Sequence, residues 1–302
     1  MPQDEEVSVL TTGYALLDVD DGRRLERFGE LVLDRPAPGA EGHVAGDSRA
    51  WARADARFDR ADRGDVEHEG WTTISGGPIE PWSISEADLR LELRLAPSGQ
   101  VGFFPEGAPN RAWIGRQAAR LAHEAGNQPA VLNLFGYTGA STLAGARRGA
   151  AITHVDASRP AVAWARRNAE LNDLADAPIR WISDDAATFA ERELRRGRRY
   201  GGVILDPPSY GHGASGHPWR LADDLPGLLA TCAALLVDGP AFILLTAHTP
   251  GFGPDRLGEA LFEALEPEVG PDAGARIEVD DQSLLSDSGI RLHLGAMARW
   301  TQ

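Results

Sequence analysis

A short proline-containing segment holds the residues best suited to chemistry in this sequence. Asp206 ends an apolar run and is followed by Pro207, Pro208, Ser209 and Tyr210. Two prolines fix the backbone and remove two donors, so Asp206 and nearby carbonyl oxygens can accept hydrogen bonds from an amino group while Tyr210 stacks on a planar ligand. We expect Asp206, Pro207, Pro208 and Tyr210 to form a catalytic shelf; the alternative is a proline turn with a capping aspartate.

A second segment has the composition of a ligand-binding turn. The apolar run Ala130–Phe135 leads through Gly136, Tyr137, Thr138 and Gly139 into a helical stretch. Glycine permits a tight turn and close approach of the backbone to a ligand, beside a positive helix N-terminus.

An acidic residue complements this turn. Asp156 ends the next apolar run, and an acid at the tip of the second strand can bind both hydroxyls of a ribose. The alternative is a structural turn followed by a helix-capping acid. The turn lacks the third glycine of G-x-G-x-x-G, which a dinucleotide-binding turn normally has. Together with the proline shelf, this predicts S-adenosylmethionine as the cofactor and methyl transfer as the reaction.

Alternating elements must position these residues. From about residue 109, apolar runs predict strands at Ala130–Phe135, Ile152–Asp156, Ile179–Ser183, Val203–Asp206 and Phe242–Thr246. Helical stretches fall between them near 139–149, 158–173, 185–197 and 221–237. This alternation implies right-handed crossovers and a parallel sheet. Two final strands, Arg276–Val279 and Ile290–Arg299, flank a polar loop over 280–289 and should pair antiparallel. We therefore predict an α/β fold with a doubly wound, mostly parallel seven-stranded sheet.

The first third of the chain has a different character. Asp21-Gly22 between the runs Tyr14–Asp20 and Arg23–Leu33 is a strong hairpin signal. Residues 36–70 are expected to be loop-like, and further strands are expected at Trp71–Ile74, Trp82–Ile84 and Leu89–Leu95. We predict a β-rich N-terminal domain over 1–105, which could recognise the substrate, and a methyltransferase domain over 106–302.

Composition limits the remaining possibilities. The net charge of −15 argues against a broad phosphate-binding surface, although arginines cluster at 192–199 and either bind phosphate locally or cover solvated helix faces. No apolar run reaches the roughly 18 residues of a membrane span, and the acidic start is unlike a signal peptide. We expect a cytoplasmic protein without membrane or metal partners. The single cysteine, Cys232, lies in an apolar helical run and is expected to be structural.

Taken together, the motifs Asn133–Gly139, Val155–Ser158, Asp185-Ala186 and Asp206–Tyr210 resemble those of the bacterial class I methyltransferases of the 23S ribosomal RNA cytosine-methyltransferase type. The resemblance covers about 109–300 and implies the Rossmann-like methyltransferase fold and an RNA substrate. Gly102-Phe103-Phe104 resembles the family's preceding motif, which lies near the cofactor, although Pro105-Glu106-Gly107 departs from the usual continuation.

The resemblance also implies roles in binding S-adenosylmethionine. Phe135 to Gly139 would wrap the methionine end, Asp156 would bind the ribose, and Asp185 would accept from the adenine amino group, with Asp184 as its rival. The implied cofactor site comprises Phe104, Asn133, Phe135, Gly136, Tyr137, Thr138, Gly139, Asp156, Ala157, Ser158, Asp185, Ala186 and Asp206.

One departure from the family affects the chemistry. The family has a cysteine at the end of its fifth strand, where this chain has Leu245-Thr246-Ala247-His248. Methylation of cytosine carbon 5 needs such a nucleophile, so we expect a nitrogen acceptor instead, because its lone pair needs mainly positioning and electrostatic stabilisation. His248 is either a general base or a residue satisfied beside the strand end.

Three functions remain open. The first is methylation of a nitrogen of a ribosomal RNA base, the second is methylation of a small molecule or protein, and the third is a non-catalytic cofactor-binding module. Residues 211–220, rich in glycine, are expected to form a mobile loop over the substrate with Trp219 anchoring its far end. Metal binding by His212 and His217 is not expected, because no cysteine or acid stands at ligand spacing.

Overall fold

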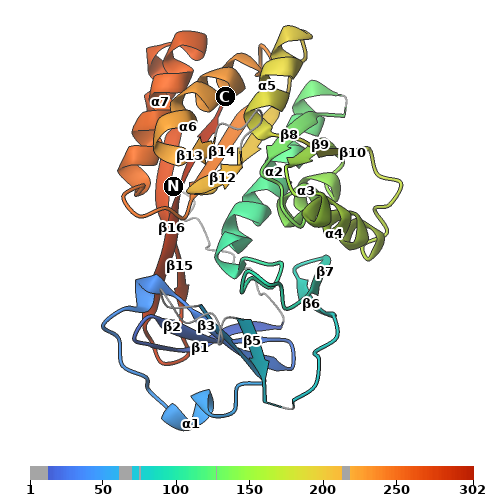
Figure 1. Cartoon of the computed structure of the whole chain (residues 1–302). Coiled ribbons are helices and arrows are strands. Elements are labelled where there is room, and N and C mark those ends of the chain that lie inside the picture. Colours follow the sequence, from blue (N-terminus) through green and yellow to red (C-terminus); the bar gives the residue numbers. More distant parts are fainter. Residues whose placement is uncertain (1–12, 61–69, 75, 127, 213–217) are drawn as a thin grey trace. The chain divides into compact units, whose positions relative to one another are not determined.

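The computed structural model describes residues 13–60, 70–74, 76–126, 128–212 and 218–302 (Figure 1). The chain divides into two compact units. The β-rich unit contains residues 1–109 together with 283–293, and the α/β unit contains residues 110–282 together with 294–302. The end of the last hairpin thus groups with the N-terminal residues.

A seven-stranded sheet forms the centre of the α/β unit, in the order β10-β9-β8-β11-β14-β16-β15. Its parallel strands are β8 (Ala130–Leu134), β9 (Ala151–Asp156), β10 (Ile179–Ser183), β11 (Gly202–Leu205) and β14 (Phe242–Ala247). β16 (Arg291–Thr301) pairs antiparallel with β14 and is followed by β15 (Ile277–Leu285) at the edge. The predicted doubly wound fold is confirmed. The strand order reverses between β8 and β11, which is where such sheets bind ligands.

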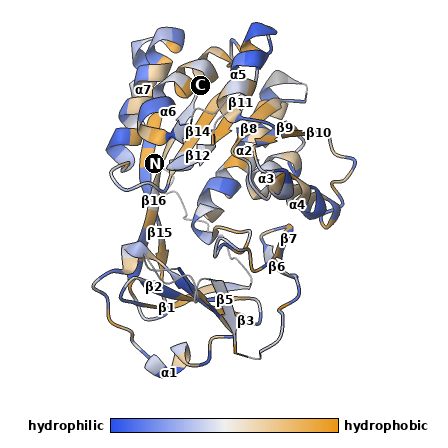
Figure 2. Cartoon of the chain, in the orientation of Figure 1, coloured by the Kyte–Doolittle hydropathy of each residue, from blue (hydrophilic) through white to orange (hydrophobic). Residues whose placement is uncertain are grey.

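Helices cover both faces of this sheet (Figure 1). They are α2 (Ala108–Ala125), α3 (Ala140–Ala146), α4 (Arg159–Glu170), α5 (Ala186–Arg195), α6 (Leu221–Ala234) and α7 (Pro254–Val269). Figure 2 shows the central strands as hydrophobic, and their buried side chains pack against α5, α6 and α7 through Phe189, Leu229 and Leu257. This core places the carboxyl ends of the five parallel strands along one edge.

The last hairpin differs from its prediction. Residues 280–285 were expected in a loop but continue β15, and the turn is confined to Ser286–Gly289, closed by a bond from Ser286 N to Ile290 O of 2.8 Å. Most side chains of β15 are exposed or half-buried. An exposed edge strand needs few apolar residues, so its sequence lacked the hydrophobic signal on which the prediction relied.

The β-rich unit contains a five-stranded and a two-stranded sheet. The first has β1 (Tyr14–Asp20), β2 (Arg23–Phe28), β3 (Leu31–Pro36), β4 (Ala56–Asp59) and β5 (Gly70–Thr73); the second has β6 (Trp82–Glu86) and β7 (Leu89–Leu93). The predicted hairpin at Asp21-Gly22 is confirmed, with φ of 72° at Gly22. The expected single run 23–33 is interrupted by a turn at Gly29, whose φ is 67°.

The expectation of a loop over residues 36–70 was wrong in part. This stretch contains β4, a 3-10 turn (Pro38–Ala40) and the short helix α1 (Ser48–Trp51). β4 is only four residues long and pairs parallel with β3 through two residue pairs. Four residues are too few to show a clear alternation of apolar and polar side chains, so the sequence carries no strand signal here.

No helix in the described part of the chain is long and apolar enough to cross a membrane. Within the same residues, no group of three or more histidine, cysteine, aspartate or glutamate side chains could hold a metal ion.

Candidate active site

The turn between β8 and α3 has an unusual backbone. Phe135 and Tyr137 have positive φ angles of 57° and 48°, and Gly139 has a φ of 88°. Each non-glycine residue in this region costs on the order of 1–3 kcal/mol, and such residues concentrate at binding sites. Gly136 is required sterically, because a Cβ there would lie 2.5 Å from the His154 ring. The sequence therefore builds a tight, constrained turn where a ligand is expected.

A buried polar chain supports this turn from below. Asn133 Nδ2 donates to Thr142 Oγ1 at 2.8 Å, and Thr142 Oγ1 lies 2.9 Å from His154 Nδ1. Burial lowers the pKa of His154 to about 3, so its ring is neutral. Asn168 Nδ2 donates to Thr138 O at 2.9 Å. Asn133 thus faces the protein interior, and Thr142, His154 and Asn168 are supporting residues that no sequence motif indicated.

Asp156 joins the ends of β8 and β9. Its Oδ2 accepts from Tyr137 N and its Oδ1 from Ser158 N, each at 2.8 Å. Burial raises the pKa of Asp156, while these two backbone bonds oppose the rise. A carboxylate oxygen can accept two hydrogen bonds, so both oxygens retain capacity for a ligand. Ser158 caps α4 by accepting from Ala161 N at 3.3 Å, and Ala157 is exposed.

The two acids after β10 have separate tasks. Asp184 forms an ion pair with Arg192 and accepts from Asp185 N at 2.9 Å. Asp185 is the N-cap of α5, with Oδ1 accepting from Thr188 N at 2.8 Å. Its Oδ2 has no partner among the described residues. Asp185 is therefore the acid with an available oxygen, and Ala186 is the first, buried residue of the helix.

The proline shelf follows β11. Asp206 is partly exposed, and its Oδ1 accepts from Thr246 Oγ1 at 2.6 Å. His248 Nε2 lies 3.6 Å from the same oxygen, while its Nδ1 lies 2.9 Å from Leu294 O. Because a carbonyl oxygen only accepts, Nδ1 bears the proton and Nε2 of the neutral ring is an acceptor. Gly295 leaves room for this ring, since a Cβ there would lie 2.9 Å from His248 Nδ1.

Trp219 connects the shelf to the β8 turn. Its Nε1 donates to Pro208 O at 2.8 Å, and its ring centroid lies 5.3 Å from that of Phe135. The predicted loop over 211–220 instead contains two paired strands, β12 (Tyr210–His212) and β13 (Pro218–Arg220). Trp219 is thus held against Pro208, whereas residues 213–217, including His217, lie outside the described residues, and the mobile loop over the substrate stays a prediction.

The turn, Asp156, Asp185 and the shelf all follow carboxyl ends of neighbouring parallel strands. Phe104, by contrast, belongs to the β-rich unit and is half-buried there, so its role in binding stays a prediction. Cys232 is fully buried in α6, and burial raises the pKa of its thiol well above the usual range. The site thus combines nucleoside-binding geometry with a partly exposed carboxylate and has no thiol among the residues described around it.

Comparison with known proteins agrees with this geometry. The model of the S-adenosylmethionine-dependent methyltransferase family matches residues 44–267, and the chain belongs to that family. The crystal structure of an S-adenosylmethionine-dependent methyltransferase from Agrobacterium tumefaciens is 31% identical, with a TM-score of 0.86 over 97% of this chain and 92% of that one. The predicted cofactor, S-adenosylmethionine, is confirmed at the level of the family.

The curated relatives of this chain include proteins named as ribosomal RNA methyltransferases. Ribosomal RNA large subunit methyltransferase I of Pseudoalteromonas translucida is 25% identical over 285 residues, which are 87% of this chain and 66% of that protein. Ribosomal RNA large subunit methyltransferase K/L of Methylococcus capsulatus is 42% identical over 128 residues, 42% of this chain and 16% of that protein. The chain thus spans less than two thirds of the length of these relatives.

Proposed function

We propose that this protein methylates a nitrogen of a ribosomal RNA base, with S-adenosylmethionine as the donor. The names of the curated relatives support ribosomal RNA as the substrate. The choice of nitrogen depends on Thr246, which stands at the end of β14, where the resemblance implies a cysteine. Its hydroxyl donates to Asp206 at 2.6 Å. A threonine hydroxyl held in this way does not supply the thiolate that addition to a cytosine ring requires.

The cofactor would be held by the three loops described above. The strained turn 135–139 would surround the methionine end, Asp156 would accept from the ribose hydroxyls, and Asp185 would accept from the adenine amino group through its available oxygen. Asn133 would act through the turn, since its side chain is committed to Thr142. S-adenosylmethionine supplies a methyl group on a sulfonium, and the sulfur retains the electron pair of the carbon–sulfur bond when the acceptor nitrogen bonds the methyl.

The acceptor nitrogen would be held between Asp206 and His248. An amino group of the substrate donates one N–H to Asp206. This hydrogen bond directs the nitrogen lone pair away from the carboxylate. A nitrogen that has bonded a methyl carries an additional proton, and His248 Nε2 is positioned to accept it. The 3.6 Å separation of Nε2 from Asp206 Oδ1 allows the resulting imidazolium to interact with the carboxylate.

Nucleoside mass spectrometry of ribosomal RNA from a deletion strain tests this function. We expect one N-methylated nucleoside to be absent in the deletion strain and restored by the wild-type gene, but not by the Asp206→Asn gene. Unchanged ribosomal nucleosides would disprove the RNA substrate. Loss of 5-methylcytidine would instead disprove the nitrogen acceptor.

A further inference from the structure

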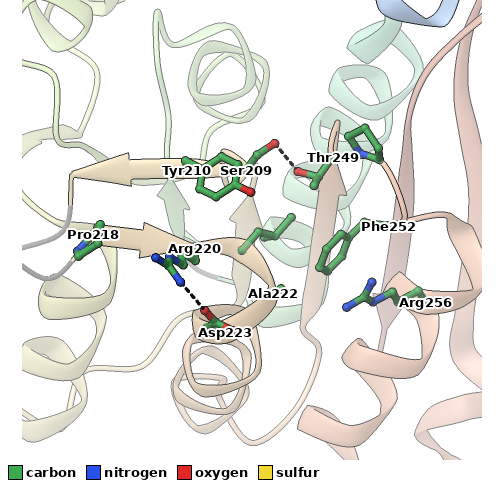
Figure 3. A pocket seen from close by; sticks show the side chains of 11 residues that line it. Ser209, Tyr210, Pro218, Arg220, Ala222, Asp223, Thr249, Phe252 and Arg256 are labelled. Carbon is green, nitrogen blue, oxygen red and sulfur yellow. Dashed lines mark hydrogen bonds and ion pairs between the residues drawn. The ribbon is translucent and has the colours of Figure 1, made fainter.

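A cavity of about 690 Å³ opens beyond the proline shelf (Figure 3). Tyr210 and Arg220, on the strands β12 and β13, line one side, while Phe252 and Arg256, after β14 and in α7, line the other. Tyr210, which we expected to stack on a planar ligand in the catalytic shelf, lines this cavity, whereas Asp206 does not. Its lining combines a flat aromatic ring with two cations.

Arg256 is a cation held in place by two contacts. Its guanidinium lies 3.8 Å from the centroid of the Phe252 ring, and its Nη1 donates to Gly251 O at 3.0 Å. No carboxylate in the described part of the chain pairs with it. Its remaining N–H groups are therefore available to an anion.

Arg220 is only weakly neutralised. Its Nη1 lies 3.9 Å from Asp223 Oδ2, and both side chains are more than 60% exposed, at 62% and 65%. An ion pair of this length and exposure contributes little. A cavity with cations on both sides and one loosely paired acid, in a protein of net charge −15, has a local preference for a phosphate.

Tyr210 supplies the second half of a nucleotide site. Its side chain is 78% exposed, which is high for a large aromatic residue. Bases of single-stranded RNA stack on exposed aromatic rings. A phosphate site beside a stacking surface matches a nucleotide better than it matches a peptide or an apolar small molecule.

The cavity lies further along the same two loops than the proposed transfer site. Ser209 and Thr249, which line it, are joined by a hydrogen bond of 2.6 Å, and they follow Asp206 and His248 in the chain. Asp206 itself does not line the cavity. We infer that the cavity holds a nucleotide next to the target in single-stranded RNA, with its base on Tyr210 and its phosphate between Arg220 and Arg256. This inference rests on the proposed function.

Binding of RNA to the full chain tests the inference. The probe is a fluorescein-labelled, mixed-sequence single-stranded RNA 12-mer, titrated by anisotropy with protein saturated with S-adenosylhomocysteine. Arg220→Gln and Arg256→Gln should each weaken binding about tenfold. The double variant should lower the salt dependence by about 0.7 in log–log slope, the value for one phosphate of a single strand. Tyr210→Ala should weaken binding about tenfold, and Tyr210→Phe should retain it.

Two further variants give opposite or neutral results. Asp223→Asn should strengthen binding about two- to threefold, because it removes a negative charge beside the phosphate. Arg195→Gln is the matched control: Arg195 belongs to the arginine cluster at 192–199, is 65% exposed on α5 and pairs with Glu191 outside the cavity, so its loss should weaken binding far less than the loss of a cavity arginine.

Equal binding by Arg195→Gln and the two cavity arginine variants would overturn the inference. The nucleoside assay reports separately on the proposed function. If the deletion removes a nucleoside and the Arg220→Gln, Arg256→Gln double variant restores it with an unchanged KM, the cavity inference alone fails. If no nucleoside changes, the function itself fails.

Discussion

Two carboxylates, one in each unit, differ in whether their charge is paired inside the protein or is left able to bind a substrate. Glu26, in β2 of the β-rich unit, has a side chain that is 0% exposed. It accepts from Arg35 Nε at 2.7 Å and Tyr14 Oη at 3.0 Å and pairs with Arg24 Nε at 3.2 Å. Burial and the neighbouring Glu26 raise the pKa of Tyr14 well above its ordinary value, so its hydroxyl remains a donor.

Asp206 has the opposite surroundings. Its side chain is 42% exposed, and a hydrogen bond from Thr246 orients it. A carboxylate surrounded by donors inside the protein contributes to one folded arrangement, whereas one with a single orienting bond keeps acceptor capacity for a substrate. Glu26 and Asp206 carry the same charge, and what distinguishes a structural from a substrate-binding carboxylate is how much of its hydrogen-bonding capacity the protein already fills.

The largest expected effect on stability comes from substituting Glu26, the structural carboxylate. Glu26→Gln should lower the free energy of unfolding by about 3–5 kcal/mol, because it removes the buried anion that pairs with Arg35 and Arg24. Urea denaturation measures this loss. The control Glu41→Gln, at an exposed position of the same unit, should change stability by less than about 0.5 kcal/mol. Equal midpoints for the two variants would show that the cluster is not structural.

Asp156 is intermediate between Glu26 and Asp206. Each of its oxygens accepts one backbone hydrogen bond and can accept another from a ligand. Asp156→Ala should weaken S-adenosylhomocysteine binding by about 2–4 kcal/mol through lost ribose contacts and a loosened turn at Tyr137. Calorimetric titration measures the affinity, and thermal unfolding shows whether the unit remains folded. Asp156→Asn keeps one acceptor oxygen and should lose less. Wild-type affinity in the alanine variant would mean that the ribose is bound elsewhere.

Asp206→Asn tests the available carboxylate. It should lower kcat at least about 100-fold while S-adenosylhomocysteine affinity stays within about twofold, because the proposed role of Asp206 concerns only the acceptor. Single-turnover kinetics on ribosomal RNA measures the rate. Thr246→Val should cause a smaller loss, about tenfold, and Thr246→Ser should restore the orienting hydroxyl. A matched loss of cofactor affinity would place Asp206 at the cofactor instead.

Cys232 extends the comparison to a buried thiol. Cys232→Ser should retain methyl transfer and form no covalent adduct with RNA in either variant, since the thiol lies in the core and burial raises its pKa. A hydroxyl at this apolar position should cost roughly 1–3 kcal/mol of stability. Activity is therefore compared at a temperature at which both proteins are folded. A folded variant that binds cofactor but transfers no methyl would restore the cytosine mechanism.

The last prediction concerns how the free energy of unfolding depends on pH through the buried His154. Its pKa falls from 6.5 to about 3 on folding, so the unfolded chain binds more protons between these values. Stability should therefore decrease as pH falls below about 6.5, by up to about 1.4 kcal/mol per pH unit. His154 Nε2 is buried and has no hydrogen-bond partner among the described residues, which leaves an added charge uncompensated there. His154→Gln should flatten this part of the stability–pH curve; an unchanged slope would assign it to other groups.

The sequence by itself predicted the architecture and the location of the site. Buried parallel strands such as 130–134 and 242–247 are continuous apolar runs, which makes them detectable, whereas the exposed second half of β15 and the short β4 are not. Parallel strands share an edge at their carboxyl ends, so the motifs that follow them had to converge there.

Only the tertiary structure decided which polar groups bond to other parts of the protein and which can bond to a ligand. Asp184 and Asp185 are adjacent and chemically alike, yet Arg192 pairs with the first and the start of α5 leaves an oxygen of the second available. Thr246 reaches Asp206 across a sequence separation of 40 residues. A hydrogen bond depends on distances of about 3 Å and on direction, and these are set by how strands and helices pack rather than by the order of residues along the chain.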